Sequence, residues 1–207
     1  MATRMEDVII VGAGPTGLAL AAELRRLGHA PMLFDKQVAG ANTSRATVVH
    51  ARTLEVLEPL GISDAMVARG IPLRSGHLRE KGGAIQATIP FDELPTKYPF
   101  ALALPQNMTE EILLARLRAL GGEVLRPIEV TSLLQTPNCV TVTYTAAGTL
   151  VQDLCGRWVV GCDGMHSAVR QAAGIGFTGG EYEEGFFLAD VEMDWPLSSH
   201  EAANTLE

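Results

Sequence analysis

Apolar and polar positions alternate in blocks near the N-terminus. Residues 8–11 form a short apolar run, which predicts a buried strand. After a glycine-containing turn, residues 18–27 are rich in Ala and Leu, both strong helix formers, and Gly28 is well placed to end a helix there. Residues 31–35 form a second apolar run that ends in an acid. This order predicts a strand–helix–strand unit, the building block of parallel α/β sheets.

Two further helices are indicated by the spacing of apolar residues. Leu54, Leu57 and Leu60 fit one helical face, and Gly61 marks the end of that helix. The second helix is predicted at residues 109–120, where Gly121 and Gly122 mark its end.

The remaining pattern is dominated by short strands. Prolines and glycines divide residues 71–104, in which residues 75–79 and 84–91 predict antiparallel strands of a second, sheet-containing region. Further alternating segments predict an antiparallel meander, at residues 123–126, 130–135, 140–145 and 150–154. Such a meander takes the place of the helix that usually crosses over to the next parallel strand.

These elements predict an α/β fold. It is a three-layer, Rossmann-like domain with a parallel central sheet and an antiparallel β-meander, together with part of a second sheet. We assign residues 1–70 and 105–184 to the nucleotide-binding domain. Residues 71–104 and 185–207 are assigned to the incomplete second sheet, in which residues 186–193 begin a strand.

Composition narrows the classes of function. Of the 207 residues, 47% are hydrophobic and 19% are charged, as expected of a globular protein with its own core. The net charge of −8 argues against binding to nucleic acid or to an anionic membrane surface. No stretch is typical of a signal peptide or a membrane span, so a cytoplasmic protein is expected. Cys139, Cys155 and Cys162 lack metal-ligand spacing and are expected to be buried thiols in a reducing compartment.

The turn after the first strand carries the strongest chemical signal. Gly12, Gly14 and Gly17 have the G-x-G-x-x-G spacing, which permits a tight turn, close approach to a pyrophosphate and close helix packing. The following helix would direct its N-terminal amides at the phosphates. Asp35 ends the second strand, where an acid accepts hydrogen bonds from a ribose diol. The unit predicts a dinucleotide site compatible with NAD or FAD; glycines that serve only packing are the alternative.

Two polar side chains have two interpretations each. Arg45 precedes the helix that contains Leu54, and its guanidinium either pairs with a pyrophosphate or faces solvent. Gln106 precedes the helix predicted at residues 109–120, where its amide either reaches a ligand or belongs to an ordinary polar loop.

A second strand–turn–helix pattern occurs at residues 158–170. Asp163 and Gly164 lie where the strand becomes the helix, which is the ligand-facing edge of an open parallel sheet. His166 has no partner at metal-ligand spacing and is expected to be a surface or capping residue.

Together, three stretches resemble the FAD-dependent aromatic hydroxylases. These are single-component flavoprotein monooxygenases such as para-hydroxybenzoate hydroxylase, and the polyketide hydroxylases are the branch that this sequence resembles most. The stretches are the glycine fingerprint with Asp35, the segment at residues 44–46, and Gly161-Cys162-Asp163-Gly164-x-x-Ser167-x-x-Arg170. The resemblance covers nearly the whole chain. It implies FAD as cofactor, NAD(P)H as co-substrate and a small aromatic molecule as substrate.

The resemblance also implies roles for individual residues. The residues that would bind the cofactor are Gly12, Gly14, Pro15, Thr16 and Gly17 at the pyrophosphate, Asp35 at the adenosine ribose with Lys36 next to it, Arg45 and Gln106 at further contacts, Val130 beside the adenine, and Asp163 and Gly164 in a motif linked to both FAD and NAD(P)H. The family more often has Glu at the position of Asp35. No side chain is assigned as a catalytic acid, a catalytic base or a metal ligand.

The implied reaction is hydroxylation of an aromatic ring through a flavin C4a-hydroperoxide, after NAD(P)H has reduced the FAD. Family members are considerably longer and carry a downstream Gly-Asp motif that this sequence lacks. We therefore expect an N-terminal FAD-binding portion that is inactive alone and that self-associates through exposed sheet edges. A non-catalytic nucleotide-binding module and a fragment of an NAD-dependent reductase are the alternatives.

Overall fold

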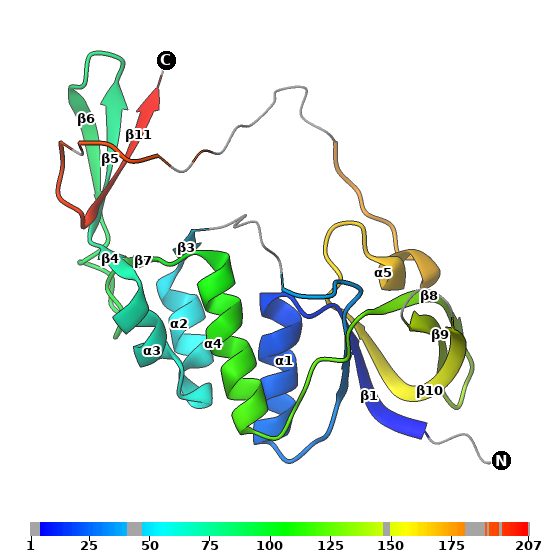
Figure 1. The fold of residues 1–207 in the computed structure, drawn as a ribbon. Helices are drawn as coiled ribbons and strands as arrows, with labels where there is room; N and C mark the ends of the chain where they lie inside the picture. Colours follow the sequence, from blue (N-terminus) through cyan, green and yellow to red (C-terminus); the bar gives the residue numbers. More distant parts are fainter. Residues whose placement is uncertain are drawn as a thin grey trace.

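The structure is a computed structural model that describes residues 5–40, 47–146, 150–180, 189, 191–194 and 196–206. Figure 1 shows the fold. Its elements are, in chain order, β1 (Met5–Val11), α1 (Pro15–Arg26), β2 (Met32–Phe34), β3 (Val48–Val49), α2 (Ala51–Leu57), the 3-10 helix η1 (Glu58–Leu60), α3 (Ser63–Arg69), β4 (Ile71–Leu73), β5 (Ser75–Glu80), β6 (Ile85–Pro90), β7 (Ala101–Ala103), α4 (Gln106–Ala119), β8 (Ile128–Gln135), β9 (Val140–Ala146), β10 (Leu150–Gly161), α5 (Ala168–Ala172) and β11 (Glu201–Leu206).

The largest sheet has five strands in the order β2-β1-β10-β9-β8. β1 pairs in parallel with β2 and β10, whereas β8, β9 and β10 form an antiparallel meander. Figure 1 shows helices α1 and α4 on one side of β1 and the meander on the other. This arrangement confirms the predicted three-layer α/β fold with parallel central strands and a meander.

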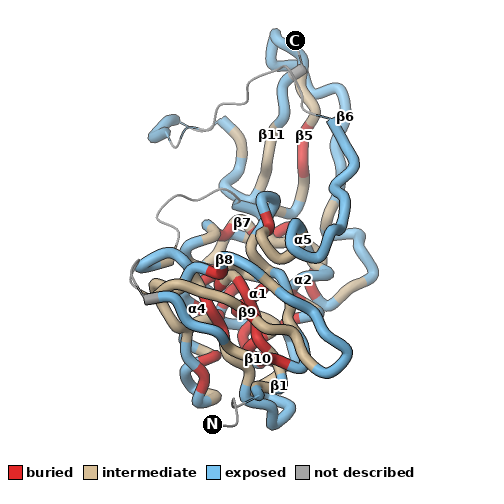
Figure 2. Tube along the Cα trace, turned by 90° about the vertical axis from the view of Figure 1, so that its right-hand side faces the viewer, coloured by how far each residue is buried: buried red, intermediate tan, exposed pale blue. Residues whose placement is uncertain are grey.

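Alternate residues of β1 face the two outer layers. Ile10 packs with Leu33 and the helices in one hydrophobic core. Ile9 and Val11 pack with Phe34 and the meander in a second core. Because successive side chains of a strand point to opposite faces, the uninterrupted apolar run of β1 fills both cores. Figure 2 shows most of the buried segments in this part of the molecule, with a further one in β5.

β10 joins the meander to the parallel strands. Its first half pairs with β9, and its second half, from Cys155 onward, pairs with β1. The sequence pattern predicted separate strands at residues 150–154 and from residue 158, but the structure has one continuous strand of 12 residues. Gly156 lies at the changeover, where a Cβ would lie 2.7 Å from Cδ1 of Ile9. The missing side chain lets β10 pass close to β1.

Two other element boundaries differ from the predictions. Residues 123–126 are not a strand: Leu125 forms a single bridge to Phe34, and Pro127, which has no amide N–H to donate, follows shortly after. The helix predicted at residues 109–120 begins earlier, because Pro105 occupies the N-cap and Gln106 is already in the first turn of α4.

Residues 71–104 divide between two small sheets. β4 and β7 form one with β3, whereas β5 and β6 pair in antiparallel fashion as predicted, and β11 joins β5 in parallel. The assignment of residue ranges to two domains stays a prediction. Of the strand predicted at residues 186–193, residues 186–188 and 190 lie outside the described residues, and residues 191–193 are not in a strand. Within the described ranges, no helix is long and apolar enough to cross a membrane.

Candidate functional site

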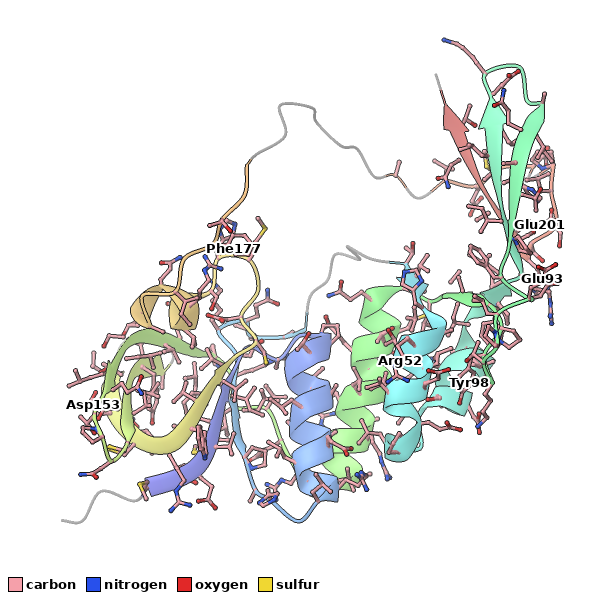
Figure 3. The ribbon with its side chains drawn as sticks, turned by 180° about the vertical axis from the view of Figure 1, so that it is seen from behind. Arg52, Glu93, Tyr98, Asp153, Phe177 and Glu201 are labelled. Atoms are coloured by element: carbon pink, nitrogen blue, oxygen red, sulfur yellow. The ribbon has the colours of Figure 1, made fainter. Side chains whose placement is uncertain are left out.

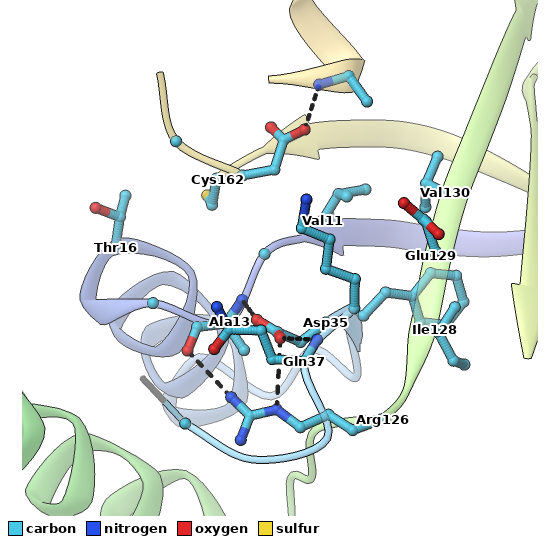
Figure 4. Close-up of a pocket in the computed structure, with 18 of the residues that line it drawn as sticks. Val11, Ala13, Thr16, Asp35, Gln37, Arg126, Ile128, Glu129, Val130 and Cys162 are labelled. Atoms are coloured by element: carbon cyan, nitrogen blue, oxygen red, sulfur yellow. Dashed lines mark hydrogen bonds and ion pairs between the residues drawn. The ribbon is translucent and has the colours of Figure 1, made fainter. Parts of the chain in front are cut away.

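The loops that follow β1, β2 and β10 surround a pocket of about 850 Å³ (Figure 4). An open α/β sheet binds its ligands at this carboxyl edge. The sequence-predicted residues that line it are Gly12, Gly14, Pro15, Thr16, Asp35, Lys36, Gln106, Val130, Asp163 and Gly164. Gly17 does not line the pocket, and Arg45 lies outside the described residues.

Gly12 and Gly17 are required by close packing. Gly12 has a φ of +97°, and a Cβ there would lie 2.8 Å from the Cα of Asp163 and would clash with the carbonyl of Cys162. A Cβ on Gly17 would clash with the carbonyl oxygen of Gly12. The Cys162 amide also donates a hydrogen bond to the Val11 carbonyl at 2.7 Å. The two strand–turn–helix motifs are therefore packed directly against each other.

Gly14 has a different environment. No atom of the described residues lies within 4 Å of the position that its Cβ would occupy. Gly14 is the N-cap of α1, which begins at Pro15 without a side chain that caps it. Because the first amides of a helix have no partner within the helix, they and the positive end of the helix dipole are available to an anion in the pocket.

Asp35 joins the glycine turn to the loop after β2. Its Oδ2 accepts a hydrogen bond from the Ala13 amide at 2.7 Å, and its Oδ1 accepts one from the Gln37 amide at 2.8 Å. Each carboxylate oxygen can accept more than one hydrogen bond, so Asp35 retains capacity for a ligand hydroxyl. Figure 4 shows these contacts converging beside the pocket.

Arg126 is the main site residue that sequence reasoning missed. Its Nε lies 3.8 Å from Oδ1 of Asp35, and the two side chains are only 15% and 13% exposed. One Nη of Arg126 also donates to the Ala13 carbonyl at 3.5 Å. The Nε is buried and has no hydrogen-bond partner among the described residues. Its sequence signal is weak, since it is one arginine in front of Pro127.

The first turn of α4 contributes an amide and an acid. Gln106 donates from Nε2 to Oε1 of Glu110 at 2.8 Å, and both residues line the pocket. Glu110 is buried, although the sequence placed it only in a predicted helix. Gln37 and Glu129 are further lining residues that no sequence pattern indicated.

The second motif uses its acid to begin α5. Asp163 accepts a hydrogen bond from the Ser167 hydroxyl at 2.5 Å and one from the Ala168 amide at 2.6 Å. Ser167 in turn caps the helix by accepting from the Arg170 amide at 3.0 Å. His166 is an exposed residue, as predicted, and Ser167 rather than His166 is the cap.

The structure corrects the prediction that the three cysteines are buried. Cys139, Cys155 and Cys162 are half-buried rather than buried. Burial and, secondarily, the nearby negative charge of Asp163 raise the pKa of the Cys162 thiol above its ordinary value.

Comparison with known proteins decides the family. A family model described as FAD binding domain matches residues 5–206. The chain belongs to this FAD-binding domain family. The sequence resemblance to FAD-dependent aromatic and polyketide monooxygenases is thereby confirmed.

This FAD-binding domain is similar to monooxygenases that are much longer. It is 38% identical over 187 residues to 12-dehydrotetracycline 5-monooxygenase/anhydrotetracycline 6-monooxygenase of Streptomyces rimosus, covering 90% of this chain and 36% of the relative. The solved OxyS anhydrotetracycline hydroxylase from Streptomyces rimosus matches with a TM-score of 0.77 at 37% identity, covering 86% of this chain and 36% of that one. The flavin-dependent monooxygenase PieE, solved in complex with FAD and substrate, matches with a TM-score of 0.76 at 27% identity. This match covers 86% of this chain and 33% of PieE. The FAD-binding domain thus spans about a third of the length of these relatives.

Proposed function

We propose that this chain binds the ADP half of FAD in the pocket at the ends of β1, β2 and β10. It would serve as the N-terminal part of an NAD(P)H-dependent flavoprotein monooxygenase that hydroxylates a phenolic or polyketide substrate. The observation that supports this most strongly is that one pocket collects the glycine turn, the acid of β2 and the Asp-Gly motif from three separate stretches of sequence. The names of the relatives support the class of reaction.

The pocket residues fit a pyrophosphate. The open space at Gly14 gives a phosphate room to approach the main chain, and the free amides of α1 would donate to its oxygens. The buried Nε of Arg126 lacks a hydrogen-bond partner among the described residues, which is the environment that an anionic ligand would complete. Arg45 is proposed to contribute a further cation.

The part of the pocket beside Asp35 and β8 fits a ribose and a base. Asp35 would accept hydrogen bonds from the ribose hydroxyls, with Lys36 beside it, because its carboxylate is already oriented by the Ala13 and Gln37 amides. Val130, which lines the same pocket on β8, is proposed to lie beside the adenine.

Gln106, Asp163 and Gly164 are proposed to contact the cofactor further along. When bound, FAD would supply the electron transfer and dioxygen activation that hydroxylation requires, while the side chains of this chain bind and orient it. The chain alone is proposed not to complete the reaction, since it spans about a third of the relatives' length.

Titration of the purified chain with FAD, followed by flavin fluorescence with NAD⁺ as competitor, tests the proposal. We expect saturable FAD binding that NAD⁺ does not displace. Asp35→Ala should weaken it roughly tenfold or more, because a hydrogen bond to a charged group contributes about 1.5–3 kcal/mol. Arg52→Ala is the matched control, since Arg52 is exposed on α2 and outside the pocket (Figure 3).

Two outcomes contradict the proposal. Preferential binding of NAD⁺ indicates a fragment of an NAD-dependent reductase. Binding of neither nucleotide by a chain that circular dichroism shows to be folded indicates a vestigial module that no longer binds a nucleotide.

A further inference from the structure

The β-meander brings two cysteines together. Cys139 ends the turn before β9, and Cys155 lies in β10. Their sulfur atoms are 3.3 Å apart, and both thiols are free and half-buried. The Sγ of Cys155 also lies 3.6 Å from Oγ1 of Thr141.

The strand register explains this contact. Cys155 lies opposite Thr141 on β9, and Cys139 precedes Thr141 by two residues. Because side chains alternate between the faces of a sheet, all three side chains share one face. Cys139 and Cys155 are therefore diagonal neighbours, close enough for side chains to meet across a strand pair.

This shared face is the outer, solvent-exposed face of the meander. Asp153 precedes Cys155 by two residues on β10 and accepts a hydrogen bond from the Thr143 hydroxyl at 2.7 Å. Figure 3 shows Asp153 on the outside of the meander. Val142, which points to the opposite face, is fully buried. A small oxidant dissolved in water therefore has access to the side of the sheet that carries the two thiols.

The main chain at Cys139 can adjust without loss of strand pairing. The β9–β10 ladder begins at Val140, which lies opposite Gly156, so Cys139 is outside it. Cys139 is held instead by the turn, in which Oγ1 of Thr136 donates to its carbonyl at 2.9 Å and accepts from its amide at 3.2 Å. Bond formation requires the sulfur atoms to approach from 3.3 Å to about 2.05 Å.

We propose that Cys139 and Cys155 form a redox-responsive dithiol, which closes into an intramolecular disulfide when it is oxidised by hydrogen peroxide. In the first step one thiolate attacks a peroxide oxygen, so that an S–O bond forms, the O–O bond breaks and hydroxide leaves to be protonated. The second thiolate then attacks the sulfenic sulfur, so that the S–S bond forms and the S–O bond breaks, again releasing hydroxide that becomes water. The two thiols together lose two electrons and two protons, and the peroxide is reduced to two molecules of water.

Cys162, the third cysteine, is an internal control for the oxidation of Cys139 and Cys155. Cys162 lies at the pocket just after the last residue of β10, whereas the turn that holds Cys139 adjoins the middle of that strand, at Gly156. Because burial and Asp163 raise the pKa of its thiol, less of it is present as the reactive thiolate near neutral pH.

Peptide mapping without reduction tests the proposal. The purified chain, free of flavin, is treated with hydrogen peroxide, its remaining thiols are alkylated, and its peptides are analysed by mass spectrometry. We expect a pair of peptides joined by a disulfide between Cys139 and Cys155. Cys162 should remain a free thiol and should therefore be found alkylated. Because a crosslink constrains the unfolded chain, the oxidised protein should also have a higher Tm, which dithiothreitol restores to the starting value.

Serine variants separate the pair from the third cysteine. Cys139→Ser and Cys155→Ser should each abolish the crosslink and the rise in Tm, whereas Cys162→Ser, the matched control, should retain both. Sulfinic or sulfonic acid at Cys139 or Cys155 without the joined peptide would overturn the proposal, as would disulfides formed mainly between separate chains. Because no flavin is present, the result is independent of the proposed function.

Discussion

At the scale of single residues, Gly12 and Gly14 belong to one motif but meet different requirements. An alanine at residue 12 would have to adopt a strained positive φ, and its Cβ would clash with the Cys162 main chain. We therefore expect Gly12→Ala to lower the free energy of unfolding by roughly 2–3 kcal/mol. The Cβ of an alanine at residue 14 would contact no atom of the described part of the chain, and the extended backbone there tolerates a side chain. Gly14→Ala should therefore cost less than about 1 kcal/mol of stability.

The variants Gly12→Ala and Gly14→Ala also distinguish an effect on stability from an effect on FAD binding. If the space at Gly14 receives a phosphate, the added methyl group displaces the phosphate from its main-chain hydrogen bonds. Gly14→Ala should then weaken FAD binding at least tenfold, because each hydrogen bond to a charged group contributes about 1.5–3 kcal/mol. Urea unfolding and flavin titration of both variants measure the two effects. Equal loss of stability in both variants would contradict the packing argument, and unchanged FAD affinity in a folded Gly14→Ala protein would contradict the phosphate position.

Cys162 allows a test of the electrostatics at the pocket. Burial and the charge of Asp163 raise the pKa of its thiol, so the thiol stays protonated to a higher pH than an ordinary cysteine. We expect its alkylation by iodoacetamide to lag at neutral pH and to increase as the pH rises through this raised pKa, because only the thiolate reacts. Mass spectrometry of each cysteine peptide over a pH series gives the midpoint of the rate profile.

Steric access affects the alkylation rate at every pH equally, so the midpoint reports the pKa. Asp163→Asn removes the negative charge and should move the midpoint for Cys162 to lower pH. A midpoint for Cys162 at the ordinary pKa of a cysteine thiol would contradict the expected shift.

At the scale of elements, the short helix α5 depends on Asp163. Its carboxylate accepts from the Ser167 hydroxyl and from the Ala168 amide, and a helix of five residues has few other hydrogen bonds. We expect Asp163→Ala to destabilise α5 locally by about 1–2 kcal/mol, as loss of an N-cap does. Amide hydrogen exchange at residues 168–172 measures this.

An acid on the meander provides the control for that prediction. Asp153 lies on an exposed strand surface, where it accepts a hydrogen bond from the Thr143 hydroxyl and makes no contact with α5 among the described residues, so Asp153→Ala should leave exchange at α5 unchanged. Equal protection of α5 in Asp163→Ala and in the parent chain would show that packing against the sheet, rather than the cap, determines this helix.

At the scale of the whole molecule, the β11-β5-β6 sheet presents an open edge. All six residues of β6 are exposed (Figure 2), and Ile85 and Ile89 are 50% and 59% exposed. Such an edge is a template for pairing with another chain. We expect an apparent mass in sedimentation equilibrium that rises with concentration, and Ile89→Lys should return the chain towards a monomer.

A second exposed apolar residue is the control for self-association. Val56 is 59% exposed on helix α2, which has no strand edge, so Val56→Lys should not change the association. A monomer at all concentrations of the parent chain would contradict the expected pairing.

The sequence by itself determined those features that depend on neighbouring residues. The apolar run of β1, the glycine spacing and the acids at residues 35 and 163 follow from local periodicity and turn chemistry, so the strand–turn–helix motifs were predictable. Four further pocket residues followed only from the resemblance to the hydroxylases, namely Pro15, Thr16, Lys36 and Val130. Only the tertiary structure decided the features that depend on distant pairing. Arg126 meets Ala13 from 113 positions away, β10 is continuous because Gly156 lets it pass close to β1, and Cys139 meets Cys155 through the strand register. Register is set by burial of a whole strand face, and no local pattern specifies which residues it brings into contact.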